Sequence, residues 1–145
     1  MKGNRGFSLL ELLIVVAIIL IIATIAIPSL LRSRQAANES AAVAGLKTLN
    51  TAEITYSSAA QNVYGDITQL IAGGLLDSGM SGTKSGYNYT VVLSGNFRDY
   101  TAFATANSTN SGRFDYYTTT DYVIRYSTDT TRAPSGLAGE TVRGN

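Results

Sequence analysis

The chain has 145 residues, no Cys, no His and no Trp, and a formal net charge of +1. Without Cys and His it has no disulfides, no thiolate nucleophile, none of the usual zinc sites and no imidazole general base. The near balance of charge gives no reason to expect nucleic-acid binding, and the composition predicts neither a cofactor nor a metal site.

Residues 7–27 form the most apolar part of the sequence. Only Ser8, Glu11 and Thr24 interrupt this run of 21 residues, and Pro28 follows it. As a helix the run would be about 30 Å long, the thickness of the hydrocarbon core of a bilayer. We therefore expect residues 7–29 to insert into a membrane. A cleaved secretory signal fits less well, because its apolar stretch is shorter and ends in a small-residue cleavage site; a single-pass anchor is a second alternative.

Two residues of this segment are unusual for a membrane helix. A carboxylate there costs free energy, so Glu11 either extends to the interface or pairs with a positive group of another chain when such helices bundle. Pro28 lacks a backbone N–H and crowds the preceding turn, so it either ends the membrane span or kinks a longer helix.

Residues 30–60 change from apolar to amphipathic. They contain no Pro and a single Gly. Apolar residues recur at spacings of three and four, which predicts one buried helix stripe: Ala42, Leu46, Leu49, Ala52, Tyr56 and Ala59. The charged residues mostly fall on other faces: Arg32, Arg34, Glu39, Lys47 and Glu53. We expect this helix to pack against a sheet.

Residues 61–145 predict a small antiparallel sheet. A short helix or turn begins at Asp66 and ends at Gly73. Alternating residues then predict strands over residues 87–93, 100–106, 114–118 and 122–126, in a sheet of three or four strands, followed by a polar tail. Dispersed carboxylates at Asp115, Asp121 and Asp129 are expected to be solvated rather than to bind an ion. The predicted fold class is α+β.

The string Arg5-Gly6-Phe7-Ser8-Leu9-Leu10-Glu11, after a short basic leader, resembles the prepilin signature of type IV pilins and of type II secretion pseudopilins. The resemblance covers about the first third of the chain. It implies a leader of residues 1–6, cleavage by a prepilin peptidase between Gly6 and Phe7, and N-methylation of Phe7. It also implies that the Phe7 amine meets Glu11 of a neighbouring subunit, and that Pro28 kinks a continuous helix.

The function that the resemblance implies is structural rather than enzymatic. The precursor would sit in the inner membrane, and pilus assembly machinery with its ATPase motor would extract it into a homopolymeric filament on the cell surface. A minor pilin or a pseudopilin of a type II secretion system is the alternative, although the absence of Trp argues against a major pseudopilin. A membrane-anchored enzyme or sensor is a further alternative, for which no cluster of converging polar residues is evident in the sequence.

Overall fold

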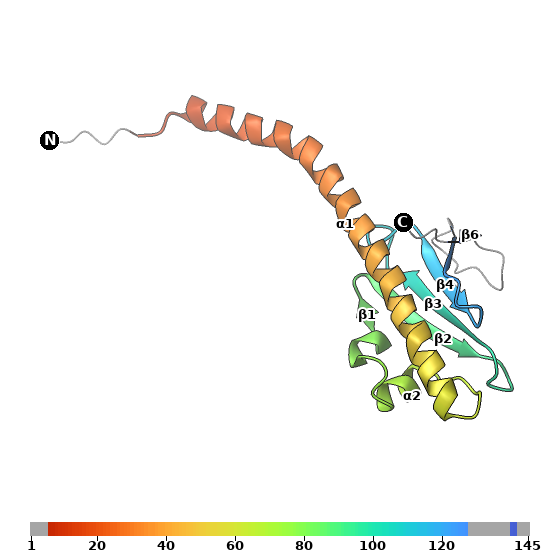
Figure 1. Ribbon diagram of the computed structural model, residues 1–145. Coiled ribbons are helices and arrows are strands. Elements are labelled where there is room, and N and C mark those ends of the chain that lie inside the picture. The colour runs from red at the N-terminus through yellow and green to blue at the C-terminus, as the bar shows by residue number, and fades with distance from the viewer. Residues whose placement is uncertain (1–5, 128–139, 142–145) are drawn as a thin grey trace. The chain divides into compact units, whose positions relative to one another are not determined.

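The computed structural model describes residues 6–127 and 140–141. The chain divides into two compact units, residues 1–34 and residues 35–145. One helix, α1 (Leu9–Ala59), begins in the first unit and ends in the second (Figure 1). It is followed by α2 (Ile67–Ala72), the 3-10 helix η1 (Ser78–Ser81), and the strands β1 (Thr83–Lys84), β2 (Tyr87–Leu93), β3 (Tyr100–Ala106), β4 (Asp115–Thr119), β5 (Arg125–Ser127) and β6 (Glu140–Thr141).

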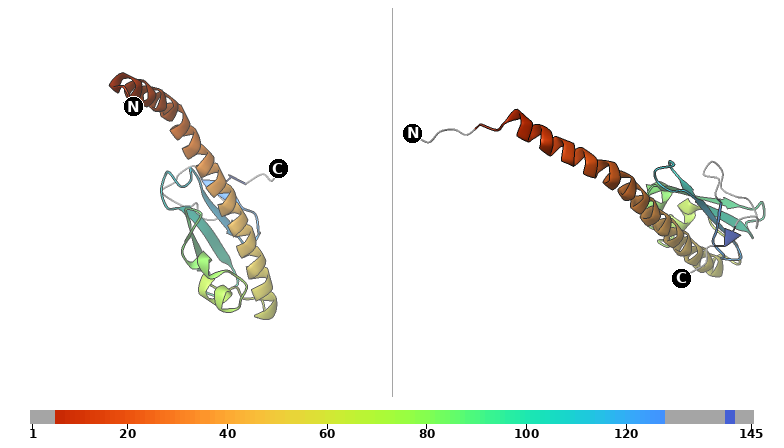
Figure 2. Two further views of the ribbon diagram at one scale, coloured as in Figure 1. Left: turned by 90° about the vertical axis from the view of Figure 1, so that its left-hand side faces the viewer. Right: turned by 90° about the horizontal axis from the view of Figure 1, so that it is seen from above.

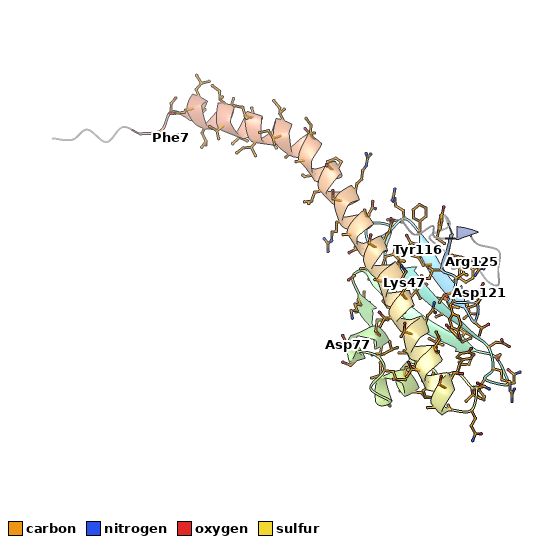
Figure 3. The ribbon with its side chains drawn as sticks, viewed as in Figure 1. Phe7, Lys47, Asp77, Tyr116, Asp121 and Arg125 are labelled. Atoms are coloured by element: carbon orange, nitrogen blue, oxygen red, sulfur yellow. The ribbon has the colours of Figure 1, made fainter. Side chains whose placement is uncertain are left out.

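In the first unit, α1 has apolar side chains on every face. The large apolar side chains from Phe7 to Leu31 are between 41% and 81% exposed, and they project all round the helix in Figure 3. An apolar surface of this extent is unusual for a protein in water. Pro28 lies inside α1, so the helix does not end there.

In the second unit, the strands form one antiparallel sheet in the order β1-β2-β3-β4-β5-β6. The longest pairing joins β2 to β3, with Tyr87 opposite Ala106 and Leu93 opposite Tyr100. Residues 35–59 of α1 cover one face of this sheet (Figure 2). The architecture confirms the predicted α+β class.

The core of the second unit lies between α1 and the sheet. Ala42, Leu46, Leu49 and Ala52 of the predicted stripe are at most 4% exposed. They belong to one cluster with residues from α2, η1 and the strands: Leu70, Met80, Tyr87, Tyr89, Tyr100, Ala102 and Ala104. The stripe continues only as far as Tyr56, which is half-buried, because Ala59 at the end of α1 is exposed.

The sheet is larger than the sequence predicted. Among the described residues it has six strands rather than three or four, because β1 and β6 are only two residues long and show no alternation. The predicted strands 87–93 and 100–106 are confirmed as β2 and β3. The strand predicted at 122–126 starts three residues later, since the Tyr122 N–H donates to the Thr119 carbonyl and the φ of Tyr122 is 61°. The tail from residue 128 lies outside the described residues, apart from β6.

Two acids of α1 do not lie where the sequence placed them. The sequence predicts that Glu39 and Glu53 lie on the polar faces of the helix, yet they are 7% and 0% exposed. The reason is visible in the spacing: positions 39, 42, 46, 49, 53 and 56 recur at intervals of three and four, so both acids lie on the buried stripe itself.

Candidate functional site

The predicted processing site lies at the start of the described chain. Gly6 is exposed, and no heavy atom lies within 4 Å of the position that a Cβ would take there. Phe7 is 77% exposed and precedes α1 (Figure 3). Both residues are therefore accessible to another protein.

Glu11 lies in the first turn of α1 and is exposed. A carboxylate near a helix N-terminus interacts favourably with the unpaired N–H groups there. Within the described residues, no ion pair or side-chain hydrogen bond of Glu11 is present. Its carboxylate is thus available to a positive group from outside the chain.

The helix that carries these residues can cross a membrane by its length and composition. Its most apolar window of 18 residues has no buried residue. The polar Thr24 side chain donates to the Ile21 carbonyl at 2.6 Å, so its hydroxyl is satisfied within the helix. An apolar environment can therefore accept this stretch of α1 without an unpaired Thr hydroxyl.

The three acids that are predicted to be solvated differ in their surroundings. Asp115 is fully buried and its Oδ1 accepts the Ala106 N–H at 2.8 Å. Asp121 pairs with Arg125 at 2.6 Å, and this hydrogen bond lowers the pKa of Asp121 to about 2 (Figure 3). Asp129 lies outside the described residues. Among the residues that the structure describes, no three acids are close enough together to hold a metal ion.

An ion pair between the buried Glu39 and the exposed Arg113 joins α1 to the segment before β4. Glu39 Oε1 accepts the Arg113 backbone N–H at 2.8 Å and its Nε–H at 3.1 Å, while Oε2 accepts Nη2–H at 3.0 Å. The guanidinium also lies 5.1 Å from the centre of the Phe114 ring. No sequence pattern predicts this pair; the position of Glu39 on the helix stripe indicates only that its side chain is buried.

Comparison with known proteins relates part of the chain to other proteins. Residues 1–27 match the prokaryotic N-terminal methylation motif. The chain is 49% identical over 55 residues to the type IV major pilin protein PilA of Myxococcus xanthus, covering 38% of this chain and 25% of that protein. It is 50% identical over 46 residues to the type IV wide pilus major component PilA4 of Thermus thermophilus, covering 32% of this chain and 35% of that protein. The matched region is thus only a quarter to about a third of each relative.

Proposed function

We propose that this chain, a member of the type IV pilin family by its N-terminal motif and helix, is a structural subunit that polymerises into a filament on the cell surface. One observation carries the proposal: the methylation motif at residues 1–27 coincides with a helix whose large apolar side chains are exposed. Such a surface is stable only where apolar groups cover it. Lipid would cover it before assembly, and the same helix of other copies would cover it afterwards.

The first step of the proposed pathway is removal of residues 1–6 by a prepilin peptidase. The exposure of Gly6 and the open space around it support access of the peptidase to the bond between Gly6 and Phe7. The new amino group of Phe7 is then N-methylated. Because the leader precedes the apolar helix, the mature chain keeps this helix.

The second step is assembly from the inner membrane, in which Glu11 selects the register. Cleavage creates a cationic amine at Phe7, and Glu11 carries the one acidic side chain of residues 7–27. In an apolar bundle, a subunit in the wrong register would leave one of these charges unpaired, which is strongly unfavourable. The role is assembly rather than catalysis, with the pilus machinery and its ATPase motor as partners.

Substitution of Gly6 by a bulky residue tests the proposal. We expect Gly6→Trp to leave the leader uncleaved and to abolish surface filaments seen by electron microscopy, whereas the leader variant Asn4→Ala keeps both. Mass spectrometry of the wild-type N-terminus should find methylated Phe7. Processing of Gly6→Trp at the wild-type level contradicts the cleavage site. Wild-type filaments that lack this chain would favour a minor pilin or a pseudopilin.

A second variant tests whether Glu11 selects the register in which neighbouring subunits pack. Glu11→Val should be cleaved and retained in the membrane fraction but should form few or no filaments, because the Phe7 amine then has no carboxylate to pair with. Leu10→Val is the matched control for a change in side-chain size. Normal filaments from Glu11→Val would rule out the proposed pairing of Glu11 with the Phe7 amine but would not affect the proposed cleavage site.

A further inference from the structure

Glu53 is a fully buried acid in the part of α1 that belongs to residues 35–145. It is 0% exposed. Its Oε2 accepts the Gly65 N–H at 3.1 Å, whereas its Oε1 has no hydrogen-bond partner in the part of the chain that the structure describes. A buried polar atom without a partner is rare and costly, and the cost rises when the atom carries charge.

The groups that face Glu53 are acidic or neutral. Asp66 and Tyr64 lie on the segment that follows α1, and Tyr100 lies on β3. Further titratable groups raise the pKa of one or both of these tyrosines: Asp99, Asp121 and Tyr122. Within the described residues, the ion-paired Lys and Arg side chains bind other acids. The ionised form of Glu53 therefore lacks a positive partner there.

Burial consequently raises the pKa of Glu53 to about 7, although the Gly65 hydrogen bond partly opposes the rise, and the nearby Asp66 carboxylate adds to it. An acid with a raised pKa in the folded state stays protonated there at pH values at which the unfolded chain has already lost the proton. The folded state is then favoured most at low pH, and this advantage is lost as the pH rises to about 7.

The same carboxyl group holds the connection between α1 and α2. This connection contains two residues with left-handed backbone, Gln61 (φ 56°) and Asn62 (φ 64°). Such conformations are uncommon for residues other than Gly and require support from neighbouring groups. The hydrogen bonds that support it include Asn62 N–H to the Ser57 carbonyl at 3.0 Å, Val63 N–H to the Ala60 carbonyl at 3.3 Å, Tyr64 N–H to the Phe97 carbonyl at 2.8 Å, and Gly65 N–H to Glu53.

We propose that Glu53 is a proton-operated latch: the neutral carboxyl group keeps residues 60–66 closed over the core, and its ionisation releases them. In the neutral form the proton resides on Oε1, and Oε2 continues to accept from Gly65. Ionisation places an uncompensated charge in the core, which water can solvate only if residues 60–66 move away. The latch does not depend on the proposed assembly role and concerns the second unit alone.

Thermal unfolding of the full chain in detergent micelles tests the latch. All nine tyrosines lie between residues 56 and 126, so the near-ultraviolet circular dichroism of Tyr reports on the second unit. Between pH 5.5 and 8.5 we expect the Tm of the wild type to fall by about 5–10 °C. Glu53→Gln, which is neutral at every pH, should show no such fall and should exceed the wild type at pH 8.5. Asp77→Asn, a change at an exposed acid, should keep the wild-type slope.

Hydrogen exchange of the backbone amides shows which residues open when the pH rises. From pH 5.5 to 8.5, the protection factors of residues 63–66 in the wild type should fall at least tenfold, whereas those of β2 and β3 should fall less. Equal pH slopes for the wild type and Glu53→Gln, or a lower Tm for Glu53→Gln at pH 8.5, would overturn the latch.

A direct titration keeps the proposal testable if Glu53→Gln does not fold. The chain has four glutamates, Glu11, Glu39, Glu53 and Glu140, so the carboxyl carbons of a Glu-labelled wild type give four resonances. Glu11→Gln removes the one that belongs to the apolar helix. A remaining resonance with a midpoint near pH 7 supports the latch. Midpoints below pH 5.5 for all three remaining resonances would contradict it.

Discussion

Glu39 and Glu53 lie on the same face of α1, yet only one of them has a counter-charge among the described residues. Glu39 accepts three hydrogen bonds from Arg113, whose guanidinium remains largely in water. Glu53 accepts a single backbone hydrogen bond. The hydrophobic spacing of the sequence places both acids on the buried stripe, but it does not reveal Arg113 as a partner, because this residue lies 74 positions further along the chain.

We expect Glu39→Ala to destabilise the second unit by about 1–3 kcal/mol. The substitution removes charge-assisted hydrogen bonds at a buried carboxylate and leaves the Arg113 backbone N–H without its acceptor. Asp77→Asn is the control, because it removes the charge of the exposed Asp77–Lys84 pair but keeps an oxygen that can accept the Gly79 N–H, and this change should cost at most about 1 kcal/mol. Urea unfolding followed by Tyr circular dichroism measures both changes. Equal losses for the two variants would show that the burial of Glu39 is irrelevant.

At the scale of elements, the sequence predicted the helices and strands that are determined by their own residues and immediate neighbours. The strands β2 and β3 have strong alternation and a turn between them, and their predicted bounds match the structure. The helix α2 follows Asp66 because the Asp66 side chain accepts the Gln69 N–H while the Gln69 side chain accepts the Asp66 N–H. The strands β1 and β6 have only two residues each, so no local alternation marked them, although β1 pairs with the adjacent β2 and β6 pairs with β5.

The capping box of α2 gives a prediction at this scale. Asp66→Ala removes the acceptor for the Gln69 N–H and should destabilise the second unit by about 1 kcal/mol. Thr68→Ala changes an exposed residue of the same helix and should have an effect within about 0.5 kcal/mol. Urea unfolding of both variants is best carried out at pH 5.5, where Glu53 is protonated and the charge of Asp66 has least influence on it. A smaller loss for Asp66→Ala than for Thr68→Ala would contradict the role of the cap.

Across the whole molecule, the single helix α1 serves two environments. In residues 35–59, the apolar side chains of the stripe are buried by the sheet of the same chain. In residues 9–31, the large apolar side chains are exposed throughout. The sequence predicted this division, because a run that is apolar on every face changes at Pro28 into a stripe on one face. What covers the first part, however, is not determined by local pattern, since lipid and other copies of the helix are equally apolar.

Because the two parts of α1 differ in burial, the same Leu→Ala substitution should have a large effect in one part and almost none in the other. Leu46 is fully buried in the core of the second unit, so Leu46→Ala should cost about 2–5 kcal/mol of unfolding free energy by leaving a cavity. Leu20 is 60% exposed on the apolar half of α1, so Leu20→Ala should change the unfolding free energy of the second unit by less than about 0.5 kcal/mol. Tyr circular dichroism in detergent micelles measures both variants, because all nine tyrosines report on the second unit. A loss for Leu20→Ala as large as that for Leu46→Ala would mean that the apolar half contributes to the folding of the second unit. An effect confined to Leu46→Ala would agree with the proposed function, in which the exposed leucines make contacts outside the chain.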